Sequence, residues 1–257
     1  MQYIVSLSGG VASAVAADRA IERYGRDQVT LWFSNVLWED EDNYRFMDDC
    51  MQRWGGDLIT YCDGRTPLQV AEHEQIIPNQ RHAPCSRELK IKPFIRFLKI
   101  QPGHNTVLLG LDWKEQHRMA KPKATYEAIE GVTVDFPLLW QPIEYRPYQE
   151  VVQSWGIAPP RMYAAGFNHA NCGGRCVKQG IKQWNRLRHW QPERFQEVRD
   201  WEQAQRAKGE PRSTYAIARD QSDYGVKPLT LLEIEQRDQS SDATASTDDM
   251  FACMCGV

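Results

Sequence analysis

The segment that most constrains the fold is a short apolar strand, Tyr3–Leu7, that runs through Ser8-Gly-Gly-Val-Ala-Ser13 into an alanine-rich helix. Glycines let the backbone turn tightly, so the amides of the first helical turn face whatever lies beyond the strand. Those amides and the helix dipole favour an anion, most often phosphate. A glycine pair alone is more often an ordinary tight turn, but its place between strand and helix predicts an anion-binding loop. Its members are Ser8, Gly9, Gly10 and Ser13.

Strand and helix patterns alternate over residues 1–140, which predicts βαβ units. Predicted strands are Tyr3–Leu7, Val29–Val36, Asp57–Cys62, Thr106–Gly110 and Val132–Phe136, with helices at Val11–Arg23 and Asp42–Trp54. The expected fold class is therefore α/β, a doubly wound, mostly parallel five-stranded sheet with a helical, cysteine-bearing C-terminal extension. In such sheets ligands bind beyond the carboxyl ends of the strands, where the glycine loop would lie.

The rest of the chain is expected to form two further parts. Residues 141–235 are predicted to be mainly helical, with one helix opening at Pro192 and a short one at the capping box Thr230–Glu233. Residues 236–257 are predicted to be a flexible tail, because Gln236–Asp249 is polar and without periodicity. That tail ends in Cys253-Met-Cys255.

Composition excludes several broad classes. The 257 residues carry a net charge of −3, so no global field calls for nucleic acid or membrane as partner. No apolar run approaches the roughly 18 residues of a membrane span. The chain passes directly into a strand without a leader pattern, so a cytoplasmic location is expected.

Seven cysteines, an odd number, cannot all pair internally. Their clustering in a chain expected to be cytosolic indicates metal or redox chemistry. Cys172 and Cys176 lie in a glycine-rich segment and could reach one metal. Three interpretations stay open at this point: an iron–sulfur cluster, zinc with help from His169, or unrelated thiols. Cys50 and Cys62 are predicted to be small buried hydrophobic residues.

Several blocks, in order, resemble the phosphoadenosine-phosphosulfate reductase and PP-loop ATP pyrophosphatase superfamily. The loop resembles its SGGxxS motif, with Ala12 where an aspartate is usual. The other blocks are Pro84-Cys-Ser-Arg-Glu-Leu-Lys-Ile-Lys-Pro93, Leu109-Gly-Leu-Asp-Trp-Lys-Glu-Gln-His-Arg118, Phe136-Pro-Leu-Leu-Trp140 and Tyr163-x-x-Gly-Phe-x-x-x-Asn-Cys-Gly-Gly-Arg-Cys176. Three residues, not two, separate the last cysteines. Together the blocks cover about two thirds of the chain, and they look most like compact phage-encoded members and the sulfur-inserting enzyme of DNA phosphorothioation.

The resemblance implies an adenine-nucleotide fold, a [4Fe–4S] cluster and sulfur chemistry, in the host cytoplasm if the chain is phage-encoded. Cys85 matches the cluster cysteine of its block, so the implied ligands are Cys85, Cys172, Cys176 and Cys253. Cys255 is similar to the mobile C-terminal thiol of the reductases and is the expected nucleophile or sulfur carrier, although the two tail cysteines could both bind iron.

Cationic side chains complete the predicted nucleotide site. ATP or a related nucleotide is expected on the glycine loop and Gly110, with Arg118 acting on the reacting phosphate or sulfate. Arg87 and Lys90 are expected to bind the same anion, with Lys92 and Arg96 nearby; a solvated helix face is the alternative. The resemblance places Phe33 and Ser34 beside the adenine. The run Glu39–Asp42 could bind Mg²⁺ with the phosphates or simply cap a helix.

A basic stretch interleaved with tryptophans follows Cys176. It contains Arg175, Lys178, Lys182, Trp184, Arg186, Arg188 and Trp190. This composition suits nucleic acid, but core tryptophans on an amphipathic helix explain it too.

The leading functional hypothesis is an adenine-nucleotide-dependent sulfurtransferase acting on a nucleic acid or nucleotide. Alternatives are a phosphosulfate reductase that releases sulfite, or a non-catalytic nucleotide- or nucleic-acid-binding protein, which Ala12 favours. A thiol or sulfur donor protein is an expected partner, a membrane is not, and a homodimer is left open.

Overall fold

The computed structural model describes residues 2–140, 147–222 and 225–239. Its centre is a five-stranded sheet in the order β3-β2-β1-β4-β5. The strands are β1 (Gln2–Leu7), β2 (Val29–Asn35), β3 (Leu58–Cys62), β4 (Asn105–Leu108) and β5 (Val132–Asp135). Every neighbouring pair is parallel. The predicted doubly wound α/β fold is therefore confirmed, with strand bounds within two residues of those expected.

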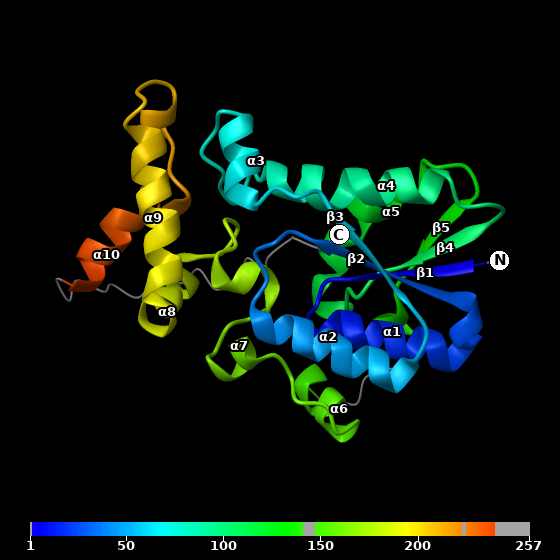
Figure 1. The fold of residues 1–257 in the computed structure, drawn as a ribbon. Helices are drawn as coiled ribbons and strands as arrows, with labels where there is room; N and C mark the ends of the chain where they lie inside the picture. Colours follow the sequence, from blue (N-terminus) through cyan, green and yellow to red (C-terminus); the bar gives the residue numbers. More distant parts are fainter. Residues whose placement is uncertain (1, 141–146, 223–224, 240–257) are drawn as a thin grey trace.

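Helices cover both faces of the sheet (Figure 1). One face carries α1 (Val11–Tyr24), α2 (Glu41–Trp54) and α6 (Tyr148–Ser154), and the other carries α4 (Lys92–Lys99) and α5 (Ala120–Glu127). Successive side chains of β1 alternate between these faces: Val5 packs in the cluster that contains Val15, and Ile4 in the cluster that contains Phe94. Burial on both faces explains why this strand is a continuous apolar run.

A helical extension stands beyond one end of the sheet (Figure 1). It contains α8 (Ile181–Trp190), α9 (Pro192–Arg206), α10 (Leu231–Gln239) and the antiparallel hairpin β6 (Ala218–Ser222) and β7 (Gly225–Leu229). The connecting elements are α3 (Pro67–His73), the π-helix η2 (Ser86–Ile91), α7 (Arg161–Ala164) and the 3-10 helices η1 (Arg26–Gln28), η3 (Trp113–Arg118), η4 (Pro137–Leu139), η5 (Asn171–Gly174) and η6 (Arg212–Thr214). Trp184 and Phe195, both fully buried, centre the core of the extension.

Local sequence signals explain the ends of these elements. Thr230 and Glu233 form the predicted capping box at the start of α10, because the Thr230 amide donates to Glu233 (2.7 Å) and the Glu233 amide to Thr230 (3.1 Å). The predicted tail began at residue 236, but α10 continues to Gln239. Cys253 and Cys255 lie outside the described residues.

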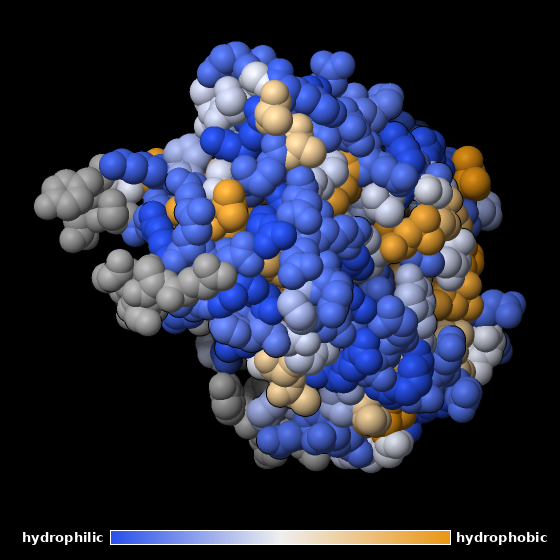
Figure 2. Space-filling view, turned by 60° about the vertical axis from the view of Figure 1, so that its left-hand side comes forward, coloured by the Kyte–Doolittle hydropathy of each residue, from blue (hydrophilic) through white to orange (hydrophobic). Residues whose placement is uncertain are grey.

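The surface is mainly hydrophilic on the face shown in Figure 2, with small, separated apolar patches. Among the described residues, no helix is both long and apolar enough to cross a bilayer. Cys50 is buried, as predicted, and burial raises the pKa of its thiol to about 12. The prediction for Cys62 is wrong: this residue is exposed, because it ends the edge strand β3.

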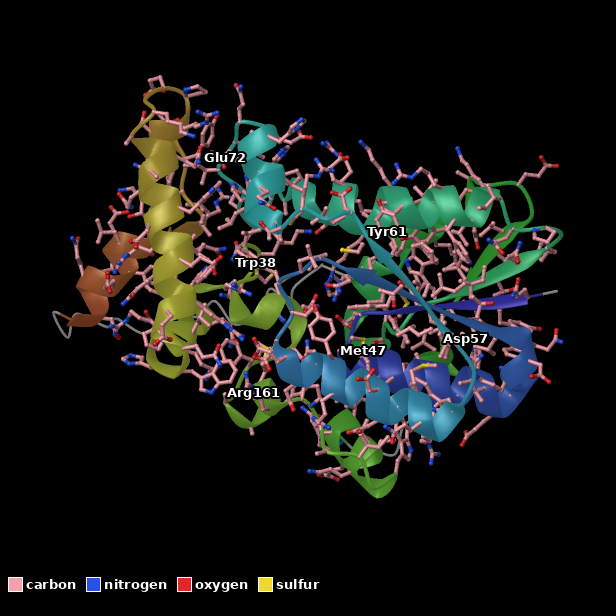
Figure 3. All side chains as sticks on the ribbon, in the orientation of Figure 1. Trp38, Met47, Asp57, Tyr61, Glu72 and Arg161 are labelled. Atoms are coloured by element: carbon pink, nitrogen blue, oxygen red, sulfur yellow. The ribbon has the colours of Figure 1, made fainter. Side chains whose placement is uncertain are left out.

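Ion pairs join the extension to the sheet. Arg161 at the start of α7 and Arg194 of α9 both donate to the carboxylate of Asp40, which caps α2 and is fully buried. Figure 3 shows Arg161 beside the amino-terminal end of α2 and Glu72 on the side of α3 that faces α9. Glu72 accepts hydrogen bonds from Gln205 (3.2 Å) and Lys208 (3.2 Å). These contacts position the extension over the carboxyl ends of the strands.

Glu202 of α9 is a buried carboxylate that the sequence pattern did not indicate. It accepts hydrogen bonds from the amides of Ile217 and Leu231, both at 2.7 Å, and so joins α9 to the residue before β6 and to the start of α10. Burial raises the pKa of Glu202 to about 7, although the two amide bonds oppose the shift. The extension is therefore held by a group that titrates near neutral pH.

We expect Glu202 to make stability depend on pH. Because its folded pKa lies above its unfolded value, its contribution is complete below about pH 4.5 and is lost as the pH rises through about 7. The free energy of unfolding should fall between pH 5 and pH 8, by up to about 3 kcal/mol. Denaturant titrations of wild type and Glu202→Gln at both pH values measure this, and the variant should lack that part of the fall. An equal fall in both proteins would contradict the assignment.

Candidate active site at the carboxyl ends of β1 and β4

The loop after β1 is closed by the side chain of Ser13. Its hydroxyl donates to the carbonyl of Gly10 (2.8 Å) and accepts from the amide of Ser8 (3.1 Å). Gly9 has φ +80°, a left-handed conformation that suits glycine. The chain thus turns directly from the strand into α1, whose first-turn amides point out of the carboxyl end of the sheet.

The loop that follows β4 packs closely against this turn. A Cβ built on Gly110 would lie 2.9 Å from the Cα of Ser13, so only glycine allows this approach without displacing the backbone. Gly10 is similarly close to α7, since its Cβ would lie 3.1 Å from the hydroxyl of Tyr163. Both glycines therefore have a packing reason to be glycine, in addition to any role toward a ligand.

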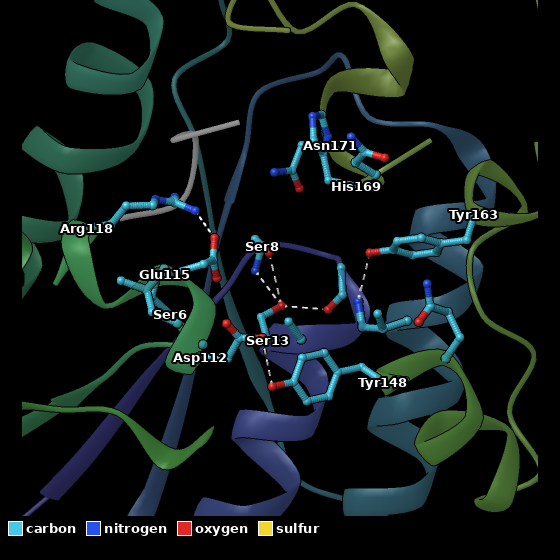
Figure 4. A pocket seen from close by; sticks show the side chains of 17 residues that line it. Ser6, Ser8, Ser13, Asp112, Glu115, Arg118, Tyr148, Tyr163, His169 and Asn171 are labelled. Atoms are coloured by element: carbon cyan, nitrogen blue, oxygen red, sulfur yellow. Dashed lines mark hydrogen bonds and ion pairs between the residues drawn. The ribbon is translucent and has the colours of Figure 1, made fainter. Parts of the chain in front are cut away.

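A cavity of about 260 Å³ opens between these loops. It is lined by Ser6, Ser8, Gly10, Val11, Ala12, Ser13, Gly110, Leu111, Asp112, Glu115, Arg118, Tyr148, Gln149, Tyr163, Asn168, His169 and Asn171. The strand order reverses between β1 and β4, and in open parallel sheets ligands bind at such a reversal. Figure 4 shows Arg118 on one side of the cavity, Tyr163 on the other, and His169 and Asn171 between them.

Charged groups lie mainly on the η3 side of the cavity. Arg118 forms an ion pair with Glu115. Asp112 caps η3 by accepting from the amide of Lys114 (2.8 Å), and it accepts from the hydroxyl of Tyr148 (3.2 Å). Burial, and next the charge of Asp112, raise the pKa of the Tyr148 hydroxyl. An anion entering the cavity would thus compete with Glu115 for Arg118.

The first turn of α1 supplies hydrogen-bond donors to the cavity. Ala12 and Ser13 line it, and their amides make no hydrogen bond within the described part of the chain. The amide of Val11 donates to the hydroxyl of Tyr163 (3.3 Å). Two unsatisfied amides, a helix N-terminus and one guanidinium together favour a phosphate or sulfate group.

The structure brings together only part of the predicted nucleotide site. Ser8, Gly10, Ser13, Gly110 and Arg118 line the cavity, and Gly9 belongs to the same loop. Ser34 and Lys90 line a separate cavity of about 20 Å³ that shares Ser6 and Ser8 with the larger one. Phe33 is buried, and Arg87 lies exposed between Glu88 and Glu74. Arg87 and Phe33 line neither cavity, so their roles stay predictions.

The three described cysteines of the predicted cluster share one apolar core. Cys85, Cys172 and Cys176 are all buried in the cluster that also contains Trp38 and Phe167. Among residues 2–140, 147–222 and 225–239, however, no three cysteine, histidine or acidic side chains are arranged to hold a metal ion. The ligand role of these thiols, and the roles of Cys253 and Cys255, stay predictions.

The backbone at Cys172 has a strained conformation, which hydrogen bonds to neighbouring residues stabilise. Cys172 has φ +56°, which is uncommon for a residue other than glycine. Its amide donates to the fully buried carboxylate of Glu39 (2.6 Å), and Asn43 donates to the carbonyl of Ala170. Lys90 lies 3.9 Å from the other oxygen of Glu39. One buried acid therefore connects the cysteine segment with the helix that follows Cys85.

The remaining predictions concern Mg²⁺ and nucleic acid. The sequence left two interpretations of the run Glu39–Asp42, Mg²⁺ binding or helix capping. Asp40 caps α2, and its carboxylate oxygens face arginines rather than the cavity. Trp184 is buried in the core, as in the amphipathic-helix interpretation of the basic stretch. Arg175 pairs with Glu197, and Arg188 pairs with Asp238. Neither Mg²⁺ nor a nucleic-acid partner is tested by these contacts.

The predicted nucleotide site lacked several residues of the cavity, among them the two acids and the two tyrosines. Asp112, Glu115 and Tyr163 stand inside blocks quoted for the resemblance, so those blocks carried a signal for them. Tyr148 belongs to no such block and reaches the cavity only because α6 packs against α1.

Comparisons with known proteins bear on the fold. No family model matches the chain, and no curated protein does. Among solved structures, the chain is similar to the crystal structure of phosphoadenylyl-sulfate (PAPS) reductase from Candida auris in a phosphate complex. The similarity has a TM-score of 0.45 and 16% sequence identity, and covers 65% of this chain and 79% of that one.

Proposed function

We propose that this chain binds an adenine nucleotide through its phosphates at Ser8–Ser13 and catalyses sulfur chemistry that depends on that nucleotide. The observation that carries the proposal is the cavity at the reversal point of the sheet, where the first turn of α1 faces Arg118. The amides and the guanidinium are donors to the same space, which suits a ligand with several anionic oxygens.

In the leading version, an acceptor oxygen attacks the α-phosphorus of ATP and the bond to pyrophosphate breaks. A hydrosulfide-level sulfur nucleophile then attacks the acceptor carbon that bears the adenylated oxygen, the C–O bond breaks, and AMP leaves with that oxygen. The loop amides and Arg118 would stabilise the charge on the departing pyrophosphate. The products are pyrophosphate, AMP and a thiolated acceptor, with a nucleic acid or nucleotide as the acceptor class.

Two alternatives have distinct products. In a phosphosulfate reductase, a thiolate attacks the sulfur atom, the S–O bond breaks, and the nucleotide phosphate leaves. A second thiol then attacks the sulfonated sulfur, which releases sulfite and leaves a disulfide. A binding protein would give no products, and Ala12, which places a methyl group in the cavity where the resembled motif has a carboxylate, favours it. Product analysis separates all three.

A substitution of Arg118 tests the nucleotide site. Replacing it with glutamine removes the guanidinium and leaves Glu115 to repel the phosphates, so affinity for ATP should fall roughly 10-fold or more. Isothermal calorimetry on wild type and Arg118→Gln measures the change. Arg65→Gln is the matched control, because Arg65 is partly exposed, pairs with Asp63 and lines neither cavity, and the affinity of this variant for ATP should stay within about two-fold of wild type. Equal affinity in wild type and Arg118→Gln would reject the site.

A [4Fe–4S] cluster is the cofactor that we propose for the cysteine segment. Thiolates are the ligands that such clusters take, and Cys85, Cys172 and Cys176 lie in one apolar core. Cys253 is the proposed fourth ligand. When bound, the cluster would supply electrons or sulfur for the reaction.

Metal analysis tests the cluster directly. Protein purified without oxygen should contain about four iron atoms and four acid-labile sulfides per chain. Cys172→Ser should lose the iron, whereas Cys50→Ser, a cysteine buried between α1 and α2, should keep it. Iron-free protein with one zinc, or equal iron in both variants, would contradict the proposal.

A further inference from the structure

Tyr163 reaches the cavity from outside the sheet. It belongs to α7, and its ring packs against both the core of the extension and the core under α1. Its hydroxyl accepts a hydrogen bond from the amide of Val11 (3.3 Å) at the first turn of α1. In Figure 4 the ring points from α7 toward the glycine loop, on the side opposite Arg118.

The hydroxyl oxygen of Tyr163 accepts hydrogen bonds from two backbone amides. Burial raises its pKa to about 12, while hydrogen bonds from the amides of Val11 and Ala170 to the phenolic oxygen oppose the shift. The group is therefore protonated at neutral pH. Since two amides donate to the oxygen, the O–H proton has to point elsewhere, and among the described residues it has no acceptor.

Tyr148 provides the contrast within the same cavity. Its hydroxyl also lines the cavity, but it donates to the carboxylate of Asp112 at 3.2 Å. One tyrosine proton is thus committed to a protein carboxylate, and the other is available to a ligand. The difference follows from position, because Tyr148 faces η3 and Tyr163 faces the first turn of α1.

We propose that Tyr163 is a specificity residue that donates its hydroxyl proton to a non-bridging oxygen of a bound nucleoside phosphate or phosphosulfate, opposite Arg118. The inference deepens the proposed function and rests on it. The amide of Val11 then polarises the hydroxyl, so that the helix N-terminus acts on the anion through the phenol. Ala170, whose amide also donates to this hydroxyl, lies two residues before Cys172, so Tyr163 contacts the cysteine segment as well as α1.

Tyr163→Phe tests the proposal, because it keeps the ring in both cores and removes only the hydroxyl. Calorimetry with ATP and with adenosine separates recognition of the phosphates from general structure. Affinity for ATP should fall roughly 10-fold or more, and affinity for adenosine should stay unchanged. Tyr24→Phe is the matched control, because Tyr24 ends α1, stacks on Tyr3 and does not line the cavity, and it should change affinity for ATP by no more than about two-fold.

Three outcomes would contradict the inference, and the third would also contradict the proposed function. If ATP and adenosine weaken together in Tyr163→Phe, the residue is structural and the inference fails. If the variant binds ATP as tightly as wild type, or more tightly, the hydroxyl makes no favourable contact with the anion and the inference also fails. If wild type binds ATP no better than adenosine, the phosphate site itself is wrong, and both the inference and the proposed function fail.

Discussion

Two buried carboxylates that follow β2 hold the rest of the architecture in place. Asp40 is fully buried and accepts hydrogen bonds from Arg161 and Arg194, each at 2.8 Å. Burial alone would raise the pKa of Asp40, but those two arginines hold it below its ordinary value. Glu39, one residue earlier, binds the amide of Cys172. Through this pair, the end of one strand fixes α7, α9 and the cysteine segment.

The cavity exists because of this attachment. The sheet and α1 supply its floor, but Tyr163, His169 and Asn171 come from the segment that Arg161 ties to Asp40. Removing one partner of a buried ion pair is costly, because the other charge is left without compensation. The position of the extension is thus coupled to the geometry of the phosphate site, although no residue of α8, α9 or α10 lines the cavity.

The fold was largely predictable because its signals are local. Alternating strand and helix periods and the glycine turn at Ser8–Ser13 are properties of consecutive residues, so the five strands lie near their expected positions. The exposure of Cys62 was not predictable in this way, because it depends on β3 being an edge strand. Glu202 is a further example: its amide partners lie 15 and 29 residues away.

The candidate site also contains residues that local sequence predicted and residues that only the tertiary structure brings together. Ser8, Gly10 and Ser13 were predictable from one turn of chain, and Gly110 and Arg118 from a block that the fold brings opposite. Arg87 was grouped with Lys90 by sequence proximity, but the turn of η2 directs Arg87 to Glu74 at the surface and Lys90 to the buried Glu39. Tyr163 depends on α7 packing against α1, a contact between segments about 150 residues apart that no local pattern encodes.

The central claim is that the loop between β1 and α1 holds the phosphates of a nucleotide. A crystal structure of the protein with ATP tests it most directly, because the phosphates are the densest part of the ligand and their position can be assigned unambiguously. We expect phosphate oxygens within hydrogen-bond distance of the amides of Ala12 and Ser13, with Arg118 turned from Glu115 toward the ligand. ATP bound elsewhere, with none of its phosphates in the cavity, would show that this loop is not the phosphate site.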